Sequence, residues 1–170
     1  PSAPTTTLDA NRLAHQATFG PTEGLMADIA RVGPKSWIAA QMGIRASAYT
    51  SGGGDAIDRH TNPNAAFCAG QGNACWEENS SIQPVLRDFY RNALYQPDQL
   101  RQRVAFALQQ ILVVSGETVS GTYGFRYYQN MLLEQAFGNY RDLLRKVTLS
   151  PFRVQVGQLV LMDGDRRISA

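Results

Sequence analysis

The chain has 170 residues, of which 44% are hydrophobic, enough to bury one substantial core but not two independent ones. Its 16 basic and 14 acidic residues give a formal charge of +2 and are spread along the chain, so no nucleic-acid partner is expected. No apolar run approaches the roughly 18 residues of a membrane-spanning helix. These bounds predict a single domain without a transmembrane segment.

The start of the chain and the overall composition both indicate export. Residues 1–6 read Pro-Ser-Ala-Pro-Thr-Thr, which is typical of a linker left after removal of a leader or a preceding region. Only 18% of the residues are charged, while Gly, Ser, Thr, Asn and Gln are frequent, a balance common in exported proteins. We therefore expect a periplasmic, cell-surface or extracellular location.

Three short helices are predicted after this linker. Thr7 is the predicted N-cap of a helix that runs to about Ala17. Thr22 caps a second helix, which Gly33 ends. Pro34 then suits the first turn of a third short helix, because its missing N–H would be unpaired there in any case.

Residues 45–80 form a long region without clear periodicity and are predicted to be an irregular insertion or a functional loop. This region holds the two cysteines of the chain, Cys68 and Cys75, in a Gly-rich stretch where a tight reversal is easy. We predict a disulfide between them, which would imply an oxidising compartment and stabilise the fold by roughly 2–3 kcal/mol. Two reduced, structurally inert thiols are the alternative. A zinc site is not expected, since four ligands are usual.

The strongest helical periodicity comes next. Apolar residues recur from Ile82 to Leu94 at positions i, i+3, i+4 and i+7, which predicts a core helix. Between Leu100 and Val113 they surround almost the whole helix, which predicts a central position in the fold.

Two more helices are predicted before residue 150. One carries apolar residues from Phe125 to Ala136, and Gly138 is predicted to end it in a left-handed conformation. Asn139 with Asp142 resembles the capping box that opens a final helix. Helices are thus expected to dominate residues 7–150, the predicted helical domain.

The helical pattern stops at Ser150. Beyond it, Phe152, Val154 and Val156 alternate with polar residues, which is the period of a half-buried strand. We predict that residues 151–170 form a strand-like tail, a short β-hairpin whose edges would support a homodimer.

The turn of this predicted hairpin contains Asp163 and Asp165 around a glycine. Their carboxylates are also a candidate calcium site, although the other ligands of an EF-hand loop are missing. No other metal or cofactor is expected.

Three phrases of the sequence together point to a known family. They are His-Gln-Ala-Thr-Phe-Gly-Pro-Thr at residues 15–22, the run at residues 100–115, and Ala-Phe-Gly-Asn-Tyr-Arg-Asp-Leu-Leu at residues 136–144. In this order they resemble the bacterial domain-of-unknown-function 1800 family over most of residues 8–150. The resemblance implies a large, mostly helical and often exported bacterial protein with no established activity. Members continue after the position of Ser150 with a helical segment that this chain lacks, so we expect a truncated or altered member.

Candidate catalytic residues are few. The chain has two histidines, and His15 lies within the first predicted helix, where a packed or capping role is favoured. His60 lies in a flexible acidic stretch where the carboxylate of Asp58 could orient the imidazole ring, although a solvated polar loop is the simpler interpretation. The nucleophile would be Ser115 or Ser120, without the G-x-S-x-G motif of a nucleophile elbow.

These observations predict a mainly α, single-domain helical bundle of about six helices, with a long disulfide-closed loop and a short C-terminal β-hairpin. The favoured function is binding or assembly at the bacterial cell surface, with residues 45–80 presented to a carbohydrate, cell-surface or protein partner. The alternative is a small hydrolase of esters or lactones that uses a Ser-His pair or a metal-activated water.

Overall fold

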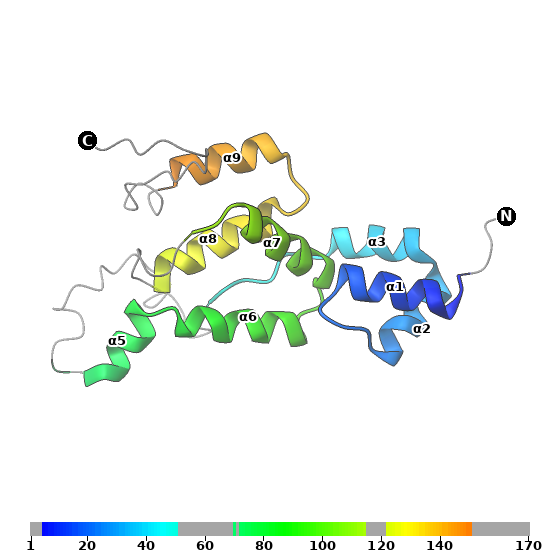
Figure 1. Cartoon of the computed structure of the whole chain (residues 1–170), viewed down its shortest axis with the longest axis horizontal. Helices are drawn as coiled ribbons and strands as arrows, with labels where there is room; N and C mark the ends of the chain where they lie inside the picture. Colours follow the sequence, from blue (N-terminus) through cyan, green and yellow to red (C-terminus); the bar gives the residue numbers. More distant parts are fainter. Residues whose placement is uncertain (1–4, 51–69, 71, 115–121, 151–170) are drawn as a thin grey trace, which may run out of the picture.

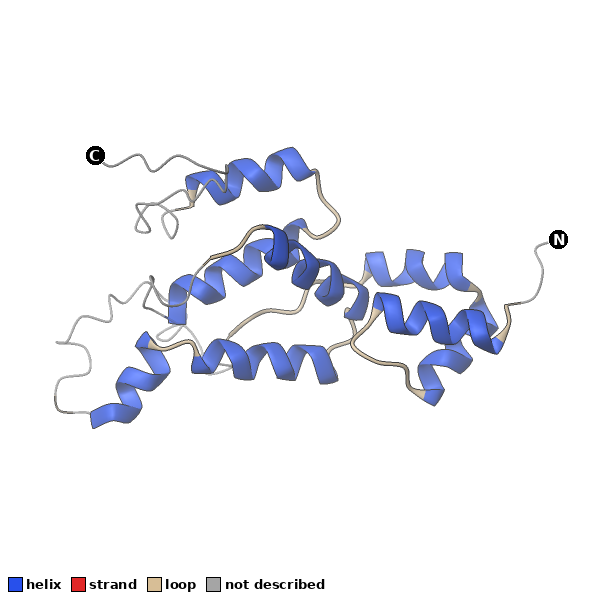
Figure 2. Ribbon diagram, in the orientation of Figure 1, coloured by secondary structure: helices blue, strands red, loops and turns tan. Residues whose placement is uncertain are grey.

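The computed structural model of the chain describes residues 5–50, 70, 72–114 and 122–150. All regular secondary structure in these residues is helical (Figures 1 and 2), which confirms the mainly α fold. They contain eight helices, more than the six or so expected. None of these helices is both long and apolar enough to cross a membrane. The β-hairpin predicted for residues 151–170 lies outside the described residues.

Three helices make up the N-terminal part: α1 (Thr7–Ala17), α2 (Glu23–Val32) and α3 (Pro34–Gly43). They pack on one another around a small apolar cluster (Figure 1). The cluster consists of the buried residues Ala10, Ala14, Ala17, Ile29 and Trp37. The three alanines allow α1 to approach its neighbours closely, and Trp37 is the largest buried side chain of the cluster.

The starts of these helices follow the expected capping chemistry with one correction. The N-cap of α1 is Thr6, not Thr7, because Thr6 keeps an extended backbone while its hydroxyl accepts a bond from the Asp9 N–H at 3.1 Å. The Asp9 carboxylate accepts the Thr6 N–H in return. Thr22 caps α2 as predicted, accepting from the Leu25 N–H at 3.2 Å.

Gly33 separates α2 from α3 and has φ +83° and ψ 151°, a backbone conformation essentially reserved for glycine. We therefore expect Gly33→Ala to lower the free energy of unfolding by about 1–3 kcal/mol. Gly24→Ala is the matched control, because Gly24 lies inside α2 with open space around it, and alanine should stabilise that helix by about 0.5–1 kcal/mol. Urea titrations of both variants measure the two effects. A Gly33→Ala protein as stable as the original would show that this conformation costs alanine nothing.

Five further helices complete the described part: α5 (Gly72–Ser80), α6 (Gln83–Tyr95), α7 (Gln99–Ile111), α8 (Thr122–Gln135) and α9 (Tyr140–Leu149). α8 contacts α5, α6, α7 and α9, and Figure 1 shows it between α6 and α9. α5 is an addition to the prediction, since it lies within residues 45–80, which were expected to be irregular.

The central position predicted for residues 100–113 is confirmed for α7, which shares it with α8. Buried residues of α8 include Phe125, Tyr128, Met131, Leu132 and Leu133, whereas α7 buries only Gln102 and Ala105. α7 has a connecting role, because it contacts α1 and α3 on one side and α6 and α8 on the other. Leu100, near its start, packs against the N-terminal cluster.

The turn between α8 and α9 corrects a second prediction. Gly138 is not among the described glycines with positive φ, so it does not end α8 in a left-handed conformation. Its N–H donates to the Gln135 carbonyl oxygen at 2.9 Å, and a Cβ at this position would lie 3.1 Å from Gln135 Oε1. Close approach therefore explains this glycine. Asn139 is the N-cap of α9 as predicted, accepting from the Arg141 N–H, but no reciprocal bond from Asp142 is found in the described part.

Candidate functional site

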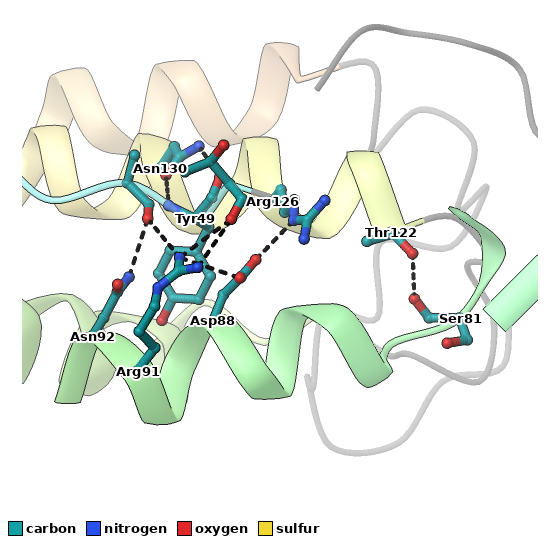
Figure 3. A network of polar contacts seen from close by, with 10 residues as sticks. Tyr49, Ser81, Asp88, Arg91, Asn92, Thr122, Arg126 and Asn130 are labelled. Carbon is teal, nitrogen blue, oxygen red and sulfur yellow. Dashed lines mark hydrogen bonds and ion pairs between the residues drawn. The ribbon is translucent and has the colours of Figure 1, made fainter. Parts of the chain in front are cut away.

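Residues 44–50 form an extended segment that passes between α6 and α8 (Figure 3). On the α8 side, Asn130 binds the backbone of Tyr49 twice: its Oδ1 accepts from the Tyr49 N–H at 2.7 Å and its Nδ2 donates to the Tyr49 carbonyl at 3.1 Å. On the α6 side, Asn92 Nδ2 donates to the Ala48 carbonyl at 3.3 Å. The two helices thereby fix the position of the buried Tyr49 side chain.

The start of the same segment is held by residues around the N-terminus of α7. Asp98 is fully buried, and its carboxylate accepts hydrogen bonds from the Ser47 N–H at 2.8 Å and the Ser47 hydroxyl at 2.6 Å. Arg101 donates to the Ile44 carbonyl at 3.2 Å. The 44–50 segment, which has no helix or strand bonds of its own, therefore satisfies its backbone through side chains.

A buried ion pair lies beside this segment. Asp88 of α6 accepts from Arg126 Nε of α8 at 2.7 Å, and both side chains are only 5% exposed. Arg91 lies 3.2 Å from the other Asp88 oxygen and also donates to the Thr50 carbonyl. Burial raises the pKa of the Asp88 carboxyl above its ordinary value, and the hydrogen bond and charge of Arg126 offset this only in part. Burial, together with the charge of Asp88, also raises the pKa of the Tyr49 phenol, which therefore stays neutral.

Tyr49 also lines a pocket of about 200 Å³ between α6, α7 and α8, called here the α6 pocket. Half of the described residues that line it are aromatic: Tyr49, Phe89, Tyr90, Phe106, Phe125 and Tyr128. Four more are aliphatic: Ile82, Val85, Leu86 and Val114. The remaining two are glutamines, Gln109 of α7 and Gln129 of α8.

The α6 pocket lies next to a row of exposed apolar side chains on α6. Leu86 is 42% exposed, Tyr90 62% and Leu94 67%, and Ile82 begins the row at 38%. The prediction that this whole apolar surface is core is therefore wrong. α6 buries a narrower face made of Pro84, Val85, Asp88 and Asn92.

One polar side chain of the α6 pocket stands out by its burial. Gln129 is only 6% exposed, yet its side-chain amide makes no hydrogen bond with another described residue. The Tyr128 hydroxyl, in contrast, already donates to the Leu112 carbonyl. The amide atoms of Gln129 are not among the fully buried atoms without a partner in the described part, so the amide faces the pocket and can take a hydrogen-bond partner there.

A wider groove of about 770 Å³ lies between α8 and α9. Its walls carry charges of both signs, from Glu134 and Asp142 and from Arg145 and Lys146. Because these charges oppose one another, the groove indicates no particular class of ligand. The α6 pocket, with its uniform lining, is the stronger candidate for a binding site.

The residues predicted from the sequence as catalytic or metal-binding lie elsewhere. His60, Asp58, Ser115, Ser120, Asp163 and Asp165 are all outside the described residues, so these assignments stay predictions. Cys75 lies in α5, but Cys68 is outside the described residues, and the disulfide likewise stays a prediction. His15 is exposed in the last turn of α1 rather than packed. In the part of the chain that is described, no group of His, Cys, Asp or Glu side chains is arranged to hold a metal ion.

The polar residues around the 44–50 segment were not predicted from the sequence. A signal for two of them exists, because Asp88 and Asn92 are spaced four apart on the same face as Val85, where a polar residue must find a partner. No such signal exists for Asn130, whose partner is the backbone of a residue 81 positions earlier.

The described residues thus define an all-helical domain with an aromatic pocket between three of its helices. The family model described as "Protein of unknown function (DUF1800)" matches residues 12–153, and the chain belongs to this family. The resemblance inferred from the three sequence phrases is therefore confirmed. No curated protein and no solved structure matches the chain.

Proposed function

We propose that this chain is a binding module of the bacterial cell surface and that it takes up an apolar partner at the α6 pocket. The observation that carries the proposal is the continuity between the aromatic pocket and the exposed row Ile82, Leu86, Tyr90 and Leu94. Exposed apolar patches of this kind on soluble domains mark interaction sites more often than scattered single residues do.

The polar contacts behind the pocket support this proposal. Tyr49 forms part of the wall, and its backbone is held by Asn130, while the ion pair of Asp88 and Arg126 links the two helices on either side (Figure 3). A wall fixed in this way loses little conformational freedom when a partner binds, which favours affinity.

Location at the cell surface is the part of the proposal that comes from the sequence alone. Its support is the composition and the predicted disulfide of Cys68 and Cys75. An apolar, aromatic pocket suits an apolar partner better than a carbohydrate. The hydrolase alternative depends on His60 and the two serines, Ser115 and Ser120, and no contact of the described residues favours it.

Binding of the fluorescent apolar dye 8-anilinonaphthalene-1-sulfonate tests the site. We expect the folded protein to enhance the fluorescence of the dye and Leu86→Gln to weaken dye binding about tenfold, because a polar side chain then stands at the pocket mouth. Leu8→Gln is the matched control, since Leu8 is 75% exposed on α1, away from the pocket, and this variant should bind the dye normally.

Near-ultraviolet circular dichroism of all three proteins verifies that they are folded, because a loosely packed protein would bind the dye everywhere. Equal dye binding by Leu86→Gln and Leu8→Gln, or no binding by the folded protein, would contradict the proposed function.

A further inference from the structure

We infer that the α6 pocket binds small aromatic molecules that carry one hydroxyl group, and that the amide of Gln129 recognises this hydroxyl. The inference rests on the proposed function, which assigns binding to this pocket, and adds the chemical class of the ligand. The size of the pocket, the chemistry of its walls and the Gln129 amide in its lining each support it.

The volume of the pocket matches a single ring with a small substituent, and a larger molecule such as the dye would extend over the exposed row on α6. An apolar protein cavity of about 150 Å³ accommodates benzene, which has six non-hydrogen atoms. On the same scale, the 200 Å³ of the α6 pocket corresponds to a ligand of about eight non-hydrogen atoms.

The walls favour an aromatic ring over an alkyl chain. Phe89 and Phe106 line the pocket with ring centres 5.6 Å apart, and Phe19 meets both rings edge-on at 5.5 and 5.8 Å. Aromatic rings attract one another in such edge-to-face and offset arrangements beyond what burial alone provides. A ligand ring in the pocket would pack against this cluster of Phe19, Phe89 and Phe106 in the same way.

Gln129 provides the polar selectivity. Its amide has donor and acceptor groups, lines the pocket, and bonds to no other described residue. A ligand hydroxyl both donates and accepts, so it can satisfy either end of the amide. A hydrocarbon of the same shape would leave the amide unpaired.

Two ligands of equal size test this recognition: 4-methylphenol and 1,4-dimethylbenzene, each with eight non-hydrogen atoms. Titrations of the full chain followed by two-dimensional NMR give both dissociation constants. We expect 4-methylphenol to bind about three- to tenfold more tightly, the value of one net hydrogen bond. In Gln129→Leu this preference should vanish, while 1,4-dimethylbenzene still binds.

A second pair of variants places the ligand in the pocket. Val114→Phe should abolish binding of both ligands by filling the pocket, whereas Val113→Phe, at an exposed neighbouring position, should change neither. Equal affinity for both ligands, or an unchanged preference in Gln129→Leu, would overturn the role of Gln129. If the dye still binds in a Leu86-dependent manner in that case, the proposed function stands and only the ligand class is wrong.

Discussion

Asp88→Ala is expected to lower the free energy of unfolding by about 3–5 kcal/mol, one of the two largest effects foreseen here. The substitution removes the carboxylate that Arg126 contacts at 2.7 Å in a site where both side chains are 5% exposed. The guanidinium of Arg126 then loses the charge and the hydrogen bond of Asp88 but keeps the desolvation cost of its burial. Guanidinium chloride denaturation at neutral pH, monitored by helical circular dichroism, measures the loss.

An exposed pair provides the matched control. Asp28 and Arg31 also form an ion pair, but their side chains are 47% and 72% exposed. Asp28→Ala should therefore change stability by no more than about 0.5 kcal/mol. Similar losses in Asp28→Ala and Asp88→Ala would mean that burial of the Asp88 pair does not matter to the fold.

Asn130→Ala is expected to lower the free energy of unfolding by about 2–4 kcal/mol, since it leaves both the N–H and the carbonyl of Tyr49 without their bonds. It should also weaken dye binding at the α6 pocket, because the Tyr49 wall loses its anchor on α8. Thermal unfolding and the fluorescence titration described above measure these two effects separately.

Asn139→Ala distinguishes this effect from the general cost of removing an asparagine. Asn139 caps the exposed start of α9, so its loss should cost about 1 kcal/mol and leave the pocket unaffected. A fully stable Asn130→Ala protein with normal dye binding would show that the 44–50 segment does not depend on the two hydrogen bonds of Asn130.

The helices that sequence reasoning located best are those with both an apolar period and a capping residue. Thr22, Gly33 and Pro34 bound α2 and α3 as predicted, because caps act through the nearest backbone groups. α5 was missed for the opposite reason. Its nine residues include Gly, two Asn and Ser, which are poor helix formers, and they show no apolar period, so contacts with α6 and α8 must stabilise it.

The candidate site was less predictable than the fold. An apolar period shows how wide the apolar surface of a helix is, but not how much of it a neighbour covers. The pattern from Ile82 to Leu94 therefore predicted a core helix, although α8 covers only the face of α6 around Val85 and Asp88. Likewise, nothing near Gln129 in the sequence distinguishes an unpaired amide from one with a distant partner.

The 44–50 segment has a consequence for how the chain acquires its structure. Its hydrogen-bond partners Asn92, Asp98 and Asn130 follow it by 44, 51 and 81 positions, so its contacts are far less local than those within a helical hairpin. Closing such long loops carries an entropic cost before the contacts form, which slows folding. On a translating ribosome, Tyr49 must wait until α8 has emerged before its place in the core exists.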